Sequence, residues 1–146
     1  AFRLAHFIPV DRSNHESAVA SVDRAAEALH GGTSFLIYPE GTRSPDGRLQ
    51  HFKKGAVVMA IKAGVPIVPI ACSGAHRVMG KKSLVIRPGE ILVRFCAPID
   101  PTPYALEQRD ALNAVVRATL AAALPPDQRP LGLEPEIEPA SSLGAV

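Results

Sequence analysis

Two uninterrupted apolar runs, Ser34–Tyr38 (SFLIY) and Val65–Cys72 (VPIVPIAC), place the tightest limit on how this chain folds. Each run is bounded by turn residues, and an unbroken apolar run of this length is typical of a β-strand covered on both faces. Neither run approaches the roughly 20 residues that an apolar helix needs to cross a bilayer, so we expect no transmembrane helix in this sequence. The chain has 146 residues, 47% of them hydrophobic, which fits a single domain built around a buried sheet.

Helical patterns alternate with these runs. An apolar stripe from Ala18 to Leu29 recurs at helical spacing and stops at two glycines, which predicts a helix of about 16 residues. Residues 55–63, between the two strands, predict a second helix, and residues 6–10 read as a preceding extended segment. Alternating strands and helices favour right-handed crossovers and a parallel sheet. We therefore expect an α/β fold with a mostly parallel sheet and flanking helices.

The second half of the chain predicts a hairpin and a closing helix. Ser83–Arg87 and Ile91–Cys96 are β-rich runs separated by three turn residues, which predicts an added antiparallel hairpin. Thr102 offers a cap and apolar residues then recur at every fourth position up to Leu124, so a helix is expected between them.

The domain organisation follows from where proline and acidic residues gather. Residues 125–146 hold five prolines and four acids against one base, without helical or strand periodicity. We expect one domain over residues 1–124, incomplete at its N-terminus, and a Pro-rich acidic tail over 125–146 that is either mobile or wrapped around the domain. Cys72 and Cys96 match no metal spacing and are expected to be buried, reduced thiols rather than a disulfide or a metal site.

Polar clusters follow directly after two of the predicted strands. The first extended segment runs into Val10–Asn14, and the SFLIY strand runs into Pro39–Ser44. Ligands of an open parallel sheet bind beyond the carboxyl ends of its strands, where loop amides and helix N-termini point. Because neighbouring strands lie less than about 5 Å apart, we expect Arg12 and Arg43 to converge on one anion.

The expected anion is a phosphate monoester. Two planar guanidinium forks, the hydroxyl of Thr42 and a backbone left open by Gly41 suit its oxygens. The alternative is that the two arginines form surface salt bridges with Asp11 and Glu40. Their shared place at one edge of the sheet favours the phosphate.

Positive charge dominates the middle of the chain. Such a field attracts an anionic ligand or an anionic membrane surface. Lys53 and Lys54 directly precede the second predicted helix and are expected to reach the site, whereas a solvated face is the expected role of Lys81 and Lys82. Aromatic residues are sparse, so no nucleic-acid stacking surface is expected. The segment holds two acids, Glu40 and Asp46, against nine basic residues: Arg43, Arg48, Lys53, Lys54, Lys62, Arg77, Lys81, Lys82 and Arg87.

Three sequence blocks resemble the glycerolipid acyltransferase family, which includes the 1-acylglycerol-3-phosphate and lysophospholipid acyltransferases. They are FIPVDRSN (Phe7–Asn14), YPEGTRSPDGRLQHFKKGA (Tyr38–Ala56) and VPIVPIA (Val65–Ala71), and the resemblance covers about residues 4–100. The second of these is the most specific.

The resemblance implies acyl transfer from acyl-CoA or acyl carrier protein to the free hydroxyl of lysophosphatidate, a step of phospholipid biosynthesis. No metal or other cofactor is implied, and the reaction is expected at the cytoplasmic face of a membrane, either peripherally or through an N-terminal anchor. The resemblance also implies a role for the VPIVPIA block in framing the acyl chain or the structural core. By the same resemblance, the phosphate and glycerol of the acceptor would be held by Arg12, Glu40, Gly41, Thr42 and Arg43.

The resemblance also implies a catalytic His-Asp pair, which is expected upstream of Ala1. His6 and Asp11 have the spacing of that pair, but residues five apart in an extended strand lie about 16 Å from each other on opposite faces, so they are an unsuitable substitute. We therefore expect this chain alone to be inactive. Three alternatives stay open: a non-catalytic domain that binds anionic phospholipid headgroups, and acyltransferases that act on glycerol 3-phosphate or on another lysophospholipid.

Overall fold

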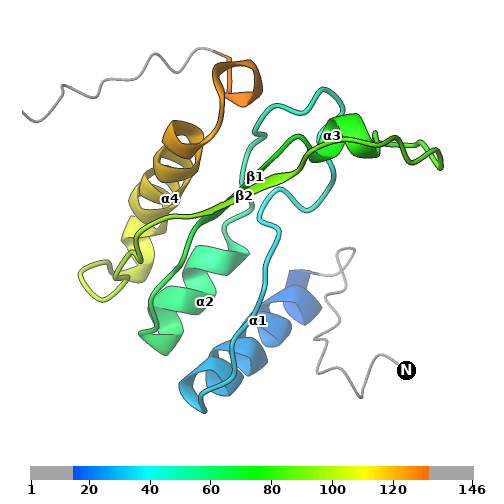
Figure 1. The fold of residues 1–146 in the computed structure, drawn as a ribbon. Coiled ribbons are helices and arrows are strands. Elements are labelled where there is room, and N and C mark those ends of the chain that lie inside the picture. Colours follow the sequence, from blue (N-terminus) through cyan, green and yellow to red (C-terminus); the bar gives the residue numbers. More distant parts are fainter. Residues whose placement is uncertain (1–14, 132–146) are drawn as a thin grey trace, which may run out of the picture.

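The computed structural model describes residues 15–131, with side chains from Ser21 onward. Figure 1 shows helix α2 lying between α1 and α4, with a short sheet crossing the middle of the molecule and α3 beyond it. No helix within these residues is long and apolar enough to span a membrane. In chain order the elements are α1 (His15–His30), α2 (Gly55–Ala63), β1 (Ile70–Ser73), α3 (Ala75–Val78), β2 (Leu92–Phe95), the 3-10 helix η2 (Leu106–Gln108), α4 (Arg109–Ala123) and the 3-10 helix η3 (Pro126–Gln128).

The two predicted N-terminal helices are confirmed. Helix α1 has the expected 16 residues and buries Ala25 and Ala26, and its Asp23 forms an ion pair with Lys62 of α2. Helix α2 ends where Gly64 adopts a left-handed conformation, φ 63°, which caps the last turn without the strain a side chain would bring.

The hydrophobic core lies between α2, β1 and α4. Helix α4 contributes a stripe at every fourth residue, as its sequence predicts, and Leu112 is fully buried. Burying a leucine side chain of this kind contributes about 1.5–3 kcal/mol to folding. The buried cluster consists of Val57, Ala71, Leu112, Val116, Leu120 and Leu124.

The start of α4 differs from the prediction. Thr102 does not cap it, because its backbone N–H and its hydroxyl donate to the carboxylate of Asp100, at 2.9 and 2.8 Å. This local turn competes with helix formation, a frequent role of threonine and aspartate. The helix begins only at Arg109, after η2.

The described sheet is antiparallel and has two strands, so the mostly parallel sheet is not what residues 15–131 form. Strand β2 pairs with β1 in a register that sets Ile70 opposite Phe95, and an isolated bridge joins Ile67 to Ile99. Of the expected strand over Val65–Cys72, only the C-terminal part forms a strand, as β1 (Ile70–Ser73). The two prolines of the expected strand lack the N–H that a continuous ladder requires.

The predicted strand Ser34–Tyr38 has no regular secondary structure and no strand partner among the described residues. Its side chains are not covered on both faces: Leu36 is 71% exposed and Tyr38 is 77% exposed. An apolar run becomes a buried strand only when other elements cover it, and the described two-stranded sheet does not extend to this run.

The predicted hairpin is also wrong, because Ile91–Cys96 pairs with β1 instead of with Ser83–Arg87. Gly74 leaves the space that the segment before β2 needs to pass close to the end of β1. A Cβ at this position would lie 2.3 Å from the carbonyl oxygen of Glu90, so only glycine lets the two segments approach. The Arg87 N–H donates to the carbonyl of Val78, at 2.9 Å, and does not join a ladder.

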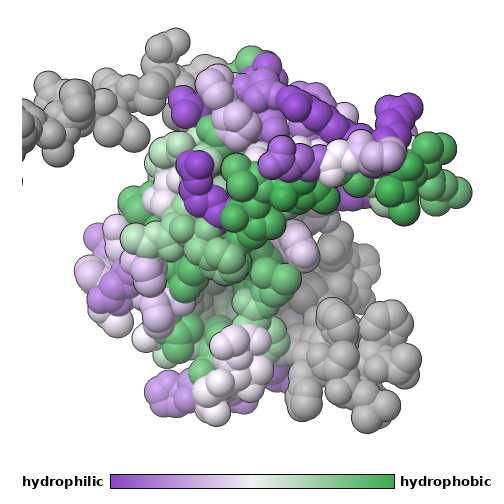
Figure 2. All heavy atoms as spheres, in the orientation of Figure 1, coloured by the Kyte–Doolittle hydropathy of each residue, from purple (hydrophilic) through white to green (hydrophobic). Residues whose placement is uncertain are grey.

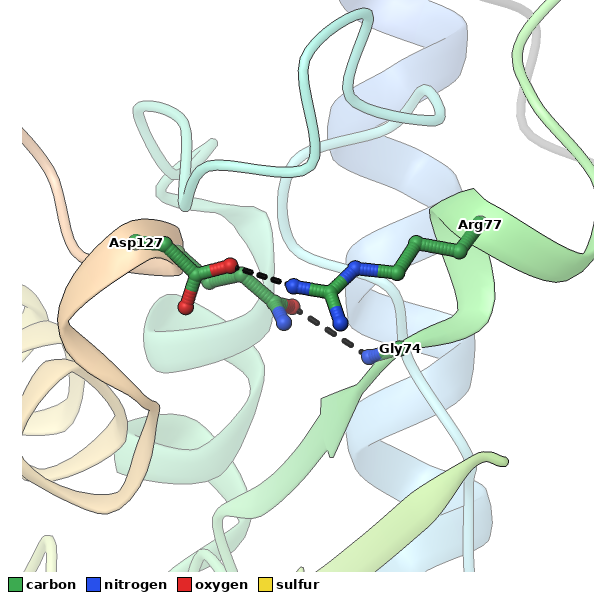
Figure 3. A network of polar contacts seen from close by, with 4 residues as sticks. Gly74, Arg77 and Asp127 are labelled. Carbon is green, nitrogen blue, oxygen red and sulfur yellow. Dashed lines mark hydrogen bonds and ion pairs between the residues drawn. The ribbon is translucent and has the colours of Figure 1, made fainter. Parts of the chain in front are cut away.

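The first part of the expected tail packs against the body. We call residues 125–131 the strap. The Leu49 N–H donates to the Gln128 carbonyl at 2.9 Å, and the Gly74 N–H donates to the Gln128 side chain at 3.4 Å. Figure 3 shows the guanidinium of Arg77 reaching toward the carboxylate of Asp127, 2.7 Å away. Gln128 is buried, so these residues wrap around the domain, while residues 132–146 lie outside the described part.

The cysteines are free thiols, but only one fits the expected burial. Cys96 is partly buried, whereas Cys72 is exposed on β1. Cys72 lies opposite Val93 in a two-stranded sheet, and that sheet leaves the side chains of β2 open to solvent.

Candidate functional site

A tight turn after the SFLIY run brings Gly41 and Lys53 together. Gly41 has φ 68°, and its N–H donates to the Tyr38 carbonyl at 3.0 Å. The Lys53 N–H donates to the Pro39 carbonyl at 2.8 Å, which fixes the segment before α2 against this turn. A Cβ at position 41 would lie 3.1 Å from Cε of Lys53, so glycine gives the lysine side chain its place over the turn.

Glu40 lies half-buried on the same turn. Burial raises the pKa of its carboxyl above the ordinary value of 4.5, while the backbone N–H of Gln50 and the charge of Arg117 act in the opposite direction. The guanidinium Nε of Arg117 donates to the Gln50 carbonyl at 3.3 Å. Helix α4 therefore supplies a cation that faces the turn, and the sequence reading did not include it.

The sequence signal that could have identified Arg117 is its position relative to the apolar stripe of α4. It follows the buried Val116 on α4, and Asn113, four residues earlier, lines the cavity described below. Residues four apart lie on the same face of a helix. Asn113 and Arg117 thus form a polar pair beside the buried stripe, and such a pair indicates that this face of α4 lines a polar site.

Thr42 and Arg43 lie on the exposed side of the turn. The Thr42 hydroxyl donates to the Arg43 carbonyl at 3.4 Å, and Nη1 of Arg43 donates to the Gly80 carbonyl, also at 3.4 Å. Within residues 15–131 no ion pair joins Arg43 to Glu40, so that one of the considered surface salt bridges is not formed. Arg12, Asp11 and His6 lie outside the described residues, and the convergence of Arg12 with Arg43 stays a prediction.

Lys54 differs from its neighbour Lys53. Its ammonium Nζ lies 2.7 Å from the carboxylate of Asp110, at the start of α4. Lys62 and Arg77 also have carboxylate partners, Asp23 and Asp127. Arg43 and Lys53 adjoin the turn and form no ion pair in the described chain, and neither does Arg117, which reaches the turn from α4.

An apolar cavity of about 950 Å³ opens beside this turn. It is walled by residues 34–38, by α2, by residues 65–72 and by α4, and Glu40 and Thr42 belong to its wall. Figure 2 shows apolar side chains spread over the middle of this face of the molecule. An apolar hollow beside a turn that carries Thr42 and Arg43 and adjoins Lys53 suits an amphiphile that has an anionic head and a hydrocarbon tail. In the described chain no three His, Cys, Asp or Glu side chains gather as metal ligands do.

A family model described as Acyltransferase matches residues 1–73. The chain is 36% identical over 132 residues to a 1-acyl-sn-glycerol-3-phosphate acyltransferase of Limnanthes douglasii, covering 90% of this chain and 47% of that protein. It is 37% identical over 129 residues to the protein of the same name from Cocos nucifera, covering 88% and 42%.

A solved structure supports the same relationship. The crystal structure of the 1-acyl-sn-glycerophosphate acyltransferase PlsC from Thermotoga maritima superposes with a TM-score of 0.66 at 33% identity, over 73% of this chain and 43% of that one. The described part of the chain therefore shares its fold with that acyltransferase. The chain spans about half the length of the curated relatives it matches. With half of its length matched by the family model and most of it aligned to these enzymes, this chain belongs to the Acyltransferase family.

Proposed function

We propose that the protein containing this chain transfers an acyl group from an acyl thioester to the free hydroxyl of 1-acylglycerol 3-phosphate, a step of phospholipid biosynthesis. The observation that carries this proposal is the apolar cavity whose wall includes Glu40 and Thr42, with Arg43 and Lys53 next to it. The names of the relatives support the same acceptor.

The described residues suit the acceptor's two ends. Arg43 and Lys53 supply donors for a doubly charged phosphate, and a guanidinium binds two phosphate oxygens at once. The cavity accommodates the acyl chain, because its walls are mostly aliphatic. Holding both ends fixes the free hydroxyl between them, which lowers the entropic part of the barrier to reaction.

The reaction needs a general base. The acceptor hydroxyl attacks the thioester carbonyl carbon and its proton passes to the base. The carbon–sulfur bond then breaks, and the base returns the proton to the leaving sulfur, which departs as the thiol of coenzyme A or acyl carrier protein. We propose that the base is the histidine of a His-Asp pair belonging to the whole protein. The family resemblance gives no role to a metal or other cofactor, and we propose none.

The proposed place of reaction is the cytoplasmic face of a membrane, where the lipid acceptor resides. We also keep the mostly parallel sheet as a proposal for the whole protein. The exposed apolar face of residues 34–38 supports it, because further strands would cover Leu36 and Tyr38.

The test is the variant Arg43→Ala in the full-length protein, assayed by thiol release from acyl-CoA with lysophosphatidate. Loss of a charge-assisted hydrogen bond costs about 1.5–3 kcal/mol, so kcat/KM for the acceptor should fall by roughly 10- to 150-fold while KM for the thioester stays unchanged. Arg109→Ala is the matched control, since Arg109 is exposed and its guanidinium donates to the nearby Leu106 carbonyl. Equal acceptor kinetics for both variants would contradict the proposed phosphate site.

The same assay separates the alternatives. Turnover of glycerol 3-phosphate or of a different lysophospholipid in preference to lysophosphatidate would change the assigned acceptor. Binding of lysophosphatidate without thiol release by the full-length protein would identify a headgroup-binding domain instead.

A further inference from the structure

The segment between α3 and β2 projects from the body of the molecule, as Figure 1 shows. We call residues 79–87 the arm. Its base is closed by the hydrogen bond from the Arg87 N–H to the Val78 carbonyl, and the Ser83 N–H donates to the Gly80 carbonyl at 3.2 Å. Lys82 adopts φ 68°, which turns the chain at this point. The arm therefore has a defined turn of its own.

The arm carries apolar side chains into solvent. Leu84 is 95% exposed, Ile86 is 72% exposed and Val85 is 62% exposed. Figure 2 shows apolar spheres gathered at the far end of the arm, with hydrophilic ones beside them. Three neighbouring aliphatic side chains without cover are unusual on a protein surface and mark a site of interaction.

Positive charge flanks this apolar tip. Lys81 and Lys82 precede it, Arg87 follows it, and the arm contains no acidic residue. None of these three cations takes part in an ion pair within residues 15–131. Aliphatic side chains between cations complement the interface of an anionic bilayer, where lipid phosphates lie directly above hydrocarbon. A soluble acidic partner would match the charges but would leave the aliphatic tip uncovered.

The arm also touches the candidate site. Nη1 of Arg43 donates to the Gly80 carbonyl, so the arm and the proposed phosphate-binding turn are joined directly. A bilayer that takes up the arm would thus lie next to Arg43.

We propose that the arm is a membrane-docking element, which inserts Leu84 and Ile86 among the headgroups of an anionic bilayer while Lys81, Lys82 and Arg87 bind lipid phosphates. This inference adds to the proposed function and does not require catalysis, because a headgroup-binding domain would use the same surface.

The chain contains no tryptophan, so Leu84→Trp introduces a single reporter at a side chain with free space around it. Its emission should shift to shorter wavelength when the 146-residue chain meets vesicles of phosphatidylcholine with roughly one third phosphatidylglycerol, but not vesicles of phosphatidylcholine alone. Leu131→Trp, at an exposed leucine of the strap, is the matched control and should not shift.

Neutralising the cations tests the electrostatic half of the proposal. The partition coefficient onto anionic vesicles should fall about fivefold for each basic residue removed, and on the order of 100-fold for Lys81→Gln, Lys82→Gln and Arg87→Gln combined. Raising the salt concentration should weaken binding in parallel. The matched control removes three exposed arginines elsewhere, through Arg24→Gln, Arg94→Gln and Arg109→Gln, and should reduce binding much less.

Three results would overturn the proposal. One is an unshifted emission of the Leu84→Trp variant on anionic vesicles. Another is an emission already shifted before vesicles are added, which would show that protein, in this chain or in a second copy, covers the arm. The third is an equal shift with soluble polyglutamate, which would identify an acidic polypeptide as the partner.

Discussion

At the scale of single residues, the turn at Gly41 shows what a sequence pattern can predict of a site. Gly41, Thr42 and Arg43 are adjacent in sequence, so their proximity requires no knowledge of the fold. The approach of Lys53 was also expected, because it directly precedes a helix that starts beside the turn. Arg117 was not found, because it reaches Gln50 across 67 residues of sequence and only tertiary packing brings them together.

Gly41→Ala should have two separable effects. An alanine held at φ 68° costs about 1–2 kcal/mol of folding free energy, and its Cβ, 3.1 Å from Cε of Lys53, would also displace the lysine. Gly64→Ala is the matched control, because Gly64 has φ 63° with no atom near its Cβ position. Urea denaturation should show similar losses for both variants, whereas only Gly41→Ala should impair acceptor binding. Equal acceptor binding in the two would remove Lys53 from the site.

At the scale of elements, the helices follow from their own sequences and the strands do not. An amphipathic helix satisfies its backbone internally and shows its buried face by periodicity, as α1 and α4 do. A strand needs a partner, and the partner is chosen by the rest of the fold. The sequence predicts a strand over Ile91–Cys96, but the pairing of this strand with β1 depends on the close backbone approach that Gly74 permits.

The strap is expected to contribute to stability through its buried Gln128. Gln128→Ala removes the acceptor of the Gly74 N–H at a position that is 4% exposed, so the free energy of unfolding should fall by about 1–3 kcal/mol. Asp127→Ala removes an exposed ion pair with Arg77 and should cost less than about 1 kcal/mol. Chemical denaturation of both variants measures the difference. A larger loss for Asp127→Ala would mean that the exposed ion pair holds the strap.

At the scale of the whole molecule, the fold lowers the pKa of some carboxyl groups and raises that of another. The pKa values of Asp46, Asp100 and Asp110 lie below the ordinary 3.8, chiefly through hydrogen bonds from the Arg48 N–H, the Thr102 N–H and the Lys54 ammonium. The pKa of Glu40 is raised by burial. The aspartates stabilise the fold above pH 3.8, and that contribution is lost as the pH falls through their lowered values.

Glu40 should act with the opposite sign. The folded protein holds the proton of Glu40 more tightly than the unfolded chain does. The free energy of unfolding therefore decreases as the pH rises from 4.5 through the raised pKa. Glu40→Gln should therefore flatten the decline of stability above pH 4.5, and Asp46→Asn should lower stability at neutral pH without effect well below pH 3.8. Denaturation free energies measured across pH 3–8 test both signs. A steeper decline in Glu40→Gln would contradict the assigned pKa direction.

The strap has a kinetic consequence as well. The guanidinium of Arg48 donates to the carbonyl of Arg129 at 3.1 Å, across 81 residues of sequence. Bringing such distant partners together costs more chain entropy than a local contact does, so we predict that this closure forms late in folding. We predict that the strap also detaches early in unfolding, and deuterium uptake at the amide of Leu49, which donates to the Gln128 carbonyl, would time each opening.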